Sequence, residues 1–170
     1  MSLTGFCVMV MGVSGSGKTA VGKALAHALH GQFLDADDLH PSTNIDKMSD
    51  GIPLTDEDRL PWLLAVSEAV NTTFVAEKPV ILACSALKKA YRTLLREHIT
   101  APLKIIYLKS SFEQVRDRLE KRSGHFMPAN LLASQFEALE EPDLAEPAIT
   151  AVDANLPIDQ VIKDSLATLN

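Results

Sequence analysis

A glycine-rich segment near the start of this 170-residue chain constrains its fold more than any other feature. The segment reads Gly12-Val13-Ser14-Gly15-Ser16-Gly17-Lys18-Thr19 and matches the pattern G-x-x-x-x-G-K-[ST] at every fixed position. An apolar run precedes it, and apolar residues at helical spacing follow it. Glycines let such a loop wrap closely around a phosphate, and the N–H groups at the following helix N-terminus form an anion cradle. The segment therefore predicts a phosphate-binding loop rather than a turn that only joins a strand to a helix.

Two side chains of this loop have predicted roles in binding a nucleotide. Lys18 would reach the β- and γ-phosphates, and Thr19 would place its hydroxyl on Mg²⁺. The loop alone does not separate a kinase from an ATPase, a GTPase or a motor. The sequence has no Asn-Lys-x-Asp motif for reading guanine, and the apolar run 80–85 ends without the Asp of a Walker B strand. Both observations favour a small-molecule kinase.

The rest of the chain alternates short apolar runs with longer helical patterns, which predicts an α/β fold with a central parallel sheet. Its length suits one domain, residues 1–170. The expected strands are 6–11, 32–35, 79–85, 103–109 and 148–153. The expected helices are 18–30, 61–74, 86–97, 112–122, 131–139 and 158–169, with Pro61 opening the second of them.

Two polar stretches interrupt this alternation, residues 37–59 and 122–130. Long irregular segments in a compact domain are commonly lids or binding loops. We therefore expect an acceptor-binding segment at about 37–62 and a lid at about 122–130.

Asp37 is the candidate group for activating an acceptor. It follows the expected strand 32–35, and ligands of open α/β sheets bind at the carboxyl ends of the strands. A carboxylate there could orient an attacking hydroxyl or accept its proton, although an Asx-turn or a helix cap is the alternative. Arg59 follows a capping signature at 55–58, and its guanidinium suits a carboxylate or a phosphate.

Two pairs of cationic residues are further candidates. Lys88 and Arg92 are four apart on an expected helix and could face an acidic acceptor. Arg118 and Arg122 share a helix face just before a glycine-containing loop, which suits arginines that close over ATP and exclude water. For both pairs the alternative is a solvated helix face, and His125 alone would be an ordinary loop histidine.

Composition limits the classes of partner. The chain has 16 basic and 22 acidic residues and a net charge of −6, which argues against a nucleic-acid binder. No run approaches the ~20 apolar residues of a membrane span, so we predict a cytoplasmic protein without a membrane partner. Cys7 and Cys84 lie in apolar runs and are predicted to be buried thiols in a reducing compartment.

Several blocks of residues follow one another along most of the chain: 12–19, Asp35-Ala36-Asp37-Asp38-Leu39-His40-Pro41, Asn44, Lys47-Met48, 51–59, Pro61-Trp62-Leu63, 84–89 with Tyr91-Arg92, Gly124-His125-Phe126, Gln135-Phe136 and Glu141-Pro142. Taken in this order, they resemble the gluconate kinases of the small P-loop type. The family pattern more often has Ser at position 19, and Thr19 keeps the metal-binding hydroxyl.

The resemblance implies a three-layer fold like that of shikimate and nucleoside monophosphate kinases, with a parallel sheet between helices and a mobile lid. It implies ATP and Mg²⁺ as cofactors, gluconate as acceptor, 6-phosphogluconate as product and a homodimer. On this hypothesis the catalytic residues are Lys18, Asp37 and Arg122, and residues 12–19, Arg118 and Arg122 hold the nucleotide. The candidates for holding the acceptor are Asp37, His40, Arg59, Lys88, Arg92 and His125. The alternatives are a kinase for shikimate or a nucleoside monophosphate, and a non-catalytic ATP-binding module.

Overall fold

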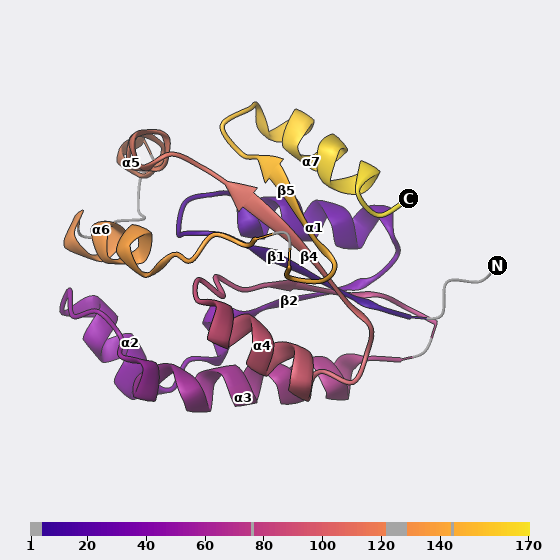
Figure 1. The fold of residues 1–170 in the computed structure, drawn as a ribbon, viewed down its shortest axis with the longest axis horizontal. Coiled ribbons are helices and arrows are strands. Elements are labelled where there is room, and N and C mark those ends of the chain that lie inside the picture. Colours follow the sequence, from indigo (N-terminus) through magenta and orange to yellow (C-terminus); the bar gives the residue numbers. More distant parts are fainter. Residues whose placement is uncertain (1–4, 76, 122–128, 144) are drawn as a thin grey trace.

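The structure is a computed structural model that describes residues 5–75, 77–121, 129–143 and 145–170. A five-stranded parallel sheet forms its centre, in the order β2-β3-β1-β4-β5 (Figure 1). The strands are β1 (Cys7–Met11), β2 (Gln32–Asp35), β3 (Val80–Ala83), β4 (Leu103–Lys109) and β5 (Ile149–Asp153). The helices are α1 (Lys18–Ala28), α2 (Ser42–Ser49), α3 (Asp56–Thr73), α4 (Lys89–His98), α5 (Phe112–Lys121), α6 (Ala129–Ala138) and α7 (Ile158–Ala167), with a 3₁₀ turn η1 (Ala36–Leu39).

Alternation along β1 explains why helices cover both faces of this sheet. Cys7, Met9 and Met11 point to one face and join a core with α3 and α4. Val8 and Val10 point to the other face and join a core with α1 and α7. All five side chains are fully buried, as expected for a strand that is covered on both sides. Figure 1 shows the two helix layers on opposite sides of the sheet, which confirms the predicted three-layer α/β fold.

The strand register brings the candidate site to one edge of the sheet. Val10 of β1 and Asp35 of β2 are both paired with Ala83 of β3, so the three parallel strands end side by side. The loops that follow their carboxyl ends therefore emerge together. These loops carry the phosphate loop (residues 12–19) and η1, at the place where ligands bind in sheets of this kind.

The predicted irregular segment 37–59 is wrong, because it contains η1, α2 and the start of α3. Helix α3 begins at Asp56 and not at Pro61. Thr55 accepts a hydrogen bond from the Asp58 N–H (3.1 Å), and the Asp58 carboxylate accepts one from the Thr55 N–H (2.9 Å). This capping box satisfies two N–H groups at the helix start and offsets the one hydrogen bond that Pro61 cannot donate.

Both cysteines are buried and free, as predicted, and burial raises the pKa of each thiol to about 12. Within the described ranges, no helix has the length and apolar character that crossing a membrane requires. The expected lid falls largely on residues 122–128, which lie outside the described residues.

Candidate active site

The phosphate loop can adopt its conformation only with glycine at particular positions. Gly12 has a φ of +155°, and a Cβ there would lie 2.7 Å from the Ser16 hydroxyl and 3.0 Å from the Leu108 carbonyl oxygen. Gly15 has a φ of +79°, and a Cβ there would lie 3.0 Å from a methyl group of Val115. The loop is thus pressed against β4 and α5, and both sites exclude a side chain.

Polar groups of this loop lack partners in a way that fits a phosphate ligand. The Ser16 side chain is 1% exposed, and its hydroxyl has no hydrogen-bond partner among the described residues. Helix α1 begins at Lys18, and no side chain caps it at Gly17. Buried polar groups are normally paired, so an unpaired hydroxyl beside an uncapped helix N-terminus fits an anionic ligand such as a phosphate.

Lys18 and Asp37 form the charged centre of the site. The Lys18 ammonium donates a hydrogen bond to the Val13 carbonyl (3.0 Å). Burial lowers the pKa of Lys18, and the carboxylates of Asp37 and Asp35 partly oppose this by raising it. Asp37 keeps contact with solvent, but the surrounding protein partly buries its carboxyl, and this burial raises its pKa. The charge of Lys18 acts in the opposite direction and lowers the pKa of Asp37. The two groups therefore stabilise each other's charge beside the phosphate loop.

Asp35 joins Thr19 to η1, and sequence reasoning did not select it for a role. The Thr19 hydroxyl donates to one carboxylate oxygen of Asp35 (3.2 Å), and the Asp37 N–H donates to the other (3.0 Å). The described residues contain no group of three or more His, Cys, Asp or Glu that could hold a metal ion. Mg²⁺ commonly takes only one or two protein oxygens in addition to phosphates and water. Thr19 and Asp35 fit that limited requirement.

These residues open into one cavity of about 1140 Å³ that is large enough for a nucleotide. Arg118, a candidate nucleotide-binding residue, lines it, and its guanidinium donates hydrogen bonds to the carbonyls of Ser16 (3.5 Å) and Ala154. An apolar part of the cavity wall was not predicted, and it lies next to the loop, since a Cβ at Gly17 would be 3.7 Å from the Cδ1 of Ile158. Leu156 is 37% exposed and Ile158 is 46% exposed, both in this wall. Exposed aliphatic side chains at the mouth of a cavity suit the face of an aromatic base. The one sequence signal for this wall is weak, namely the turn between β5 and α7.

Gln135 of α6 holds the phosphate loop from a distant part of the chain. Its carbonyl oxygen accepts a hydrogen bond from the Ser14 N–H (2.7 Å), and its amide group donates one to the Ser14 hydroxyl (3.0 Å). This two-point contact fixes the orientation of the peptide that enters the loop. The sequence marked Gln135 only as part of the family resemblance and assigned it no role.

We expect Gln135→Leu to raise the KM for ATP about 10-fold, because the partly buried N–H of Ser14 would lose its partner and the loop would lose its fixed geometry. Steady-state kinetics at saturating acceptor measure this. Ser14→Ala keeps the N–H contact and loses only the hydroxyl contact, so its effect should be smaller. An unchanged KM in Gln135→Leu, with a normal melting temperature, would contradict this role.

Next to η1, but not among the residues that line the cavity, the candidate acceptor residue His40 stacks on Trp62 with ring centroids 4.1 Å apart and an interplanar angle of 13°. The indole N–H of Trp62 donates to the carbonyl of Ala36 (2.7 Å), the residue before Asp37. Burial and the charge of Arg59 lower the pKa of His40 to about 4, so its ring is neutral at pH 7. His40 is thus held at a fixed place next to η1.

Arg59 and Lys88 lie at the N-termini of α3 and α4. Arg59 donates to the Leu54 carbonyl (2.6 Å) and the Tyr91 hydroxyl (3.4 Å) through one terminal nitrogen. Lys88 forms an ion pair with Asp56 (2.8 Å), which also accepts a hydrogen bond from Tyr91. Both cations are partly accessible, and among the described residues the Nε and second terminal nitrogen of Arg59 have no hydrogen-bond partner.

The predicted role of Arg92 in binding the acceptor does not agree with its position. The side chain is 0% exposed, and its five N–H groups are all occupied. Two donate to the Glu146 carboxylate (2.9 and 2.6 Å), and the others donate to backbone carbonyls of Ala86, Leu87 and Glu140. Arg92 is a buried structural residue, and it does not share a surface with Lys88. Arg122 and His125 lie outside the described residues.

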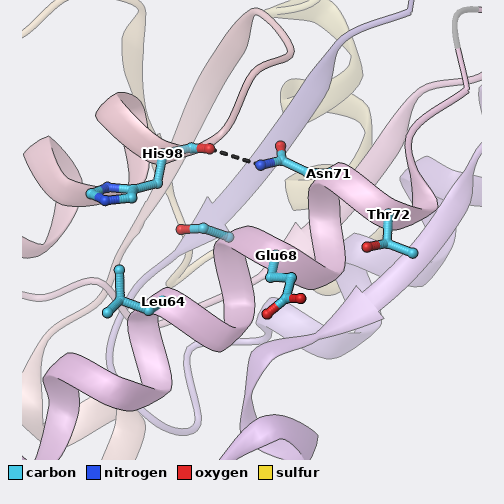
Figure 2. A pocket seen from close by; sticks show the side chains of 6 residues that line it. Leu64, Glu68, Asn71, Thr72 and His98 are labelled. Atoms are coloured by element: carbon cyan, nitrogen blue, oxygen red, sulfur yellow. Dashed lines mark hydrogen bonds between the residues drawn. The ribbon is translucent and has the colours of Figure 1, made fainter.

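A second hollow, of about 320 Å³, lies on the outer side of α3 and α4. Figure 2 shows Leu64, Glu68 and Thr72 along one side of α3, with Asn71 donating a hydrogen bond to the His98 carbonyl (2.8 Å). Asn71 also accepts from the Thr100 N–H (2.9 Å), so its amide connects α3 to the end of α4. None of the predicted site residues lines this hollow, and we do not assign it to the active site.

The fold and the phosphate-loop cavity define the class of this protein as a P-loop kinase, and a family model described as an AAA domain matches residues 7–142. The chain is 45% identical over 161 residues to the thermoresistant gluconokinase of Escherichia coli (strain K12), covering 95% of this chain and 91% of that protein. It is 46% identical over 142 residues to the gluconokinase of Gluconobacter oxydans (strain 621H), covering 84% and 79%. A crystal structure of a gluconokinase from Sinorhizobium meliloti 1021 matches with a TM-score of 0.87 and 44% identity, covering 99% of this chain and 93% of that one. The chain belongs to the gluconokinase family.

Proposed function

We propose that this protein transfers the γ-phosphoryl group of ATP to the terminal hydroxyl of gluconate, giving 6-phosphogluconate and ADP. The observation that carries the proposal is that Lys18 and Asp37 line one cavity with the phosphate loop. Lys18 is a cation that can bind phosphate, and Asp37 is a carboxylate that can act as a general base. Family membership supports gluconate as the acceptor. A cytoplasmic location and a homodimer are further parts of the proposal that rest on the sequence and the resemblance.

The nucleotide side of the reaction depends on fixed donors. The loop N–H groups, the Ser16 hydroxyl and Lys18 would hold the phosphates, and Arg118 would add positive charge at the cavity wall. Thr19, with Asp35 beside it, would hold Mg²⁺, which neutralises phosphate charge when bound. Such donors stabilise the charge that develops on the transferred group without reorganising during the reaction.

Asp37 would act on the acceptor. Its carboxylate would accept the proton of the attacking hydroxyl while the new O–P bond forms and the bond to ADP breaks. The backbone contact between the Asp37 N–H and Asp35 fixes the start of η1, so the carboxyl keeps its place beside Lys18. His40, Arg59 and Lys88 remain the candidates for holding the sugar acid, with Arg59 suited to its carboxylate. Arg122 and His125 stay predictions.

We expect acceptor-dependent ADP release from Mg-ATP with gluconate, and none above background with shikimate, AMP, other sugar acids or free hexoses. A coupled ADP assay measures this, and Lys18→Ala supplies the background because it lacks the phosphate-binding cation. Turnover with another acceptor instead would keep the kinase and reject gluconate. Tight ATP binding without acceptor-dependent ADP release would favour a non-catalytic module.

A further inference from the structure

Asn44 of α2 is buried and contacts the ring of His40. Its side chain is 2% exposed, and its amide nitrogen lies 3.0 Å from the Asp58 carbonyl oxygen and 3.2 Å from Nδ1 of His40. Asn44 belongs to the helix that follows η1, and Asp58 belongs to the first turn of α3. One amide group therefore ties the acceptor-side histidine to two helices.

The chemistry of these contacts fixes which ring nitrogen of His40 carries the proton. A backbone carbonyl only accepts hydrogen bonds, so the NH₂ group of Asn44 must face Asp58. The same NH₂ group faces Nδ1 of His40 and has no lone pair available to accept a hydrogen bond. Nδ1 must therefore be the acceptor, and the ring proton must lie on Nε2.

Two further contacts hold the ring as a neutral group in one orientation. Stacking on Trp62 fixes the ring plane, and Trp62 is itself hydrogen-bonded to the Ala36 carbonyl. A charged imidazolium would place an N–H against the Asn44 NH₂ group, which is unfavourable. Burial and the nearby charge of Arg59 act in the same direction by lowering the pKa of His40 to about 4.

We propose that Asn44 is a positioning residue that keeps His40 as the neutral Nε2–H tautomer, so that His40 donates one uncharged hydrogen bond to a hydroxyl oxygen of a polyhydroxylated acid. This rests on the proposed function, and it divides recognition between two groups. His40 reads the polyol, whereas a permanent cation such as Arg59 reads the carboxylate. A neutral donor cannot supply charge, so His40 distinguishes hydroxyl pattern rather than acidity.

The tautomer can be measured without any turnover. ¹⁵N NMR of the ring nitrogens above about pH 7.5, where exposed histidines are neutral, should report an unprotonated Nδ1 and a protonated Nε2 for His40. His98 gives an internal reference, because its Nδ1 lies 2.9 Å from the Leu94 carbonyl and must carry the proton.

In Asn44→Asp the proton should move to Nδ1 of His40, because a carboxylate accepts where the amide donated. In Asn44→Leu, which needs no buried charge, the fixed preference should be lost. A protonated Nδ1 in the wild-type protein would overturn the proposal.

Two substitutions of His40 test which nitrogen the acceptor uses. A glutamine amide reaches the position of Nε2, whereas an asparagine amide reaches only that of Nδ1. His40→Gln should keep the KM for gluconate within about threefold, and His40→Asn should raise it about 10-fold, with the KM for ATP unchanged in both. His98→Asn is the matched control on the exposed side of α4 and should leave both KM values unchanged. Equal losses in the two His40 variants would overturn this inference while leaving gluconate as the acceptor. Absence of gluconate turnover in the wild-type protein would reject the proposed function and, with it, the contact of His40 to the acceptor. The NMR result would still decide whether Asn44 sets the tautomer of His40.

Discussion

The Asp37→Asn variant is expected to lose about 10²–10⁴-fold in kcat with gluconate, the range typical of a general base, while its KM for ATP changes less than threefold. Asparagine has nearly the same shape as aspartate but cannot accept the hydroxyl proton. The backbone contact of residue 37 with Asp35 does not involve the side chain that is changed, so η1 should keep its form. The substitution therefore removes the proton acceptor and keeps the backbone of η1, and it also removes the carboxylate charge that raises the pKa of Lys18.

The pH dependence gives this experiment a second readout. Burial of the Asp37 carboxyl by the surrounding protein has the largest effect on its pKa and raises it. The charges of Asp35 and Asp38 also raise this pKa, and the charge of Lys18 lowers it. A raised pKa means that the base is lost to protonation at a higher pH than for an exposed aspartate. The rate should fall as the pH falls through that value, and this acid limb should be absent from the residual activity of Asp37→Asn.

Asp38→Asn is the matched control, because Asp38 is the exposed neighbour in η1 and does not line the cavity. It should keep most of the wild-type kcat. Pre-steady-state quench measurements of the phosphoryl-transfer step, together with ATP binding by calorimetry, separate chemistry from binding. A variant at position 37 that retained half of the wild-type rate would exclude Asp37 as the base and leave only a positioning role.

The parts of the fold that the sequence predicts well are those that local pattern determines. Strands β2 and β4 were predicted at residues 32–35 and 103–109, the bounds that the structure gives them. The apolar run of β4 leaves little alternative to a buried strand. Strand β2 has no β-branched and no buried residue, and its prediction follows from the alternation of short apolar runs with helical patterns. The phosphate loop was equally predictable, because its glycines are required by backbone geometry within a few residues.

The start of α3 was misjudged because two local rules compete there. A proline commonly opens a helix, which favoured residue 61. The reciprocal hydrogen bonds of Thr55 and Asp58 are stronger evidence, and they place the start five residues earlier. For α4 the prediction began three residues early, at residue 86. Ala86 has a φ of +43°, which no helix accommodates, and the sequence does not reveal that conformation.

The site residues that were missed or misassigned depend on contacts between distant parts of the chain. Gln135 is 121 residues from Ser14, and Glu146 is 54 residues from Arg92. A Lys and an Arg spaced four apart give the same pattern whether the helix face is solvated or buried. Only the tertiary structure shows that Arg92 turns inward to a carboxylate while Lys88 remains at the surface.

The Arg92–Glu146 pair leads to the largest expected effect on stability. Both side chains are almost fully removed from solvent (0% and 2% exposed), and their closest contact is 2.6 Å. Replacing Arg92 leaves the buried Glu146 carboxylate with only the longer ion pair to Arg96 (3.6 Å), and breaking a buried pair typically costs about 3–5 kcal/mol. Arg92→Leu is therefore expected to lower the free energy of unfolding by about that amount in urea titration.

The ion pair of Arg116 and Asp117 is the control, because both side chains are about half exposed and 3.8 Å apart. Asp117→Asn should therefore cost less than about 1 kcal/mol of the free energy of unfolding.

The same variants decide between a structural and an acceptor-binding role for Arg92. Hydrogen bonding by Arg92 is the main cause that lowers the pKa of Glu146, so its contribution to stability is present above the ordinary pKa of a glutamate and is lost as the pH falls through the lowered value. Arg92→Leu combined with Glu146→Leu removes both charges and should recover part of the lost stability. The uncompensated buried carboxylate is then gone, although the carbonyls of Ala86, Leu87 and Glu140 still lack their donor. At a temperature where the single variant is still folded, its KM for gluconate should equal that of the wild type. A raised KM in a protein of normal stability would instead mean that Arg92 leaves its buried position to bind the acceptor. The five hydrogen bonds that it would have to break make that outcome unfavourable, since each would expose or orphan a buried partner.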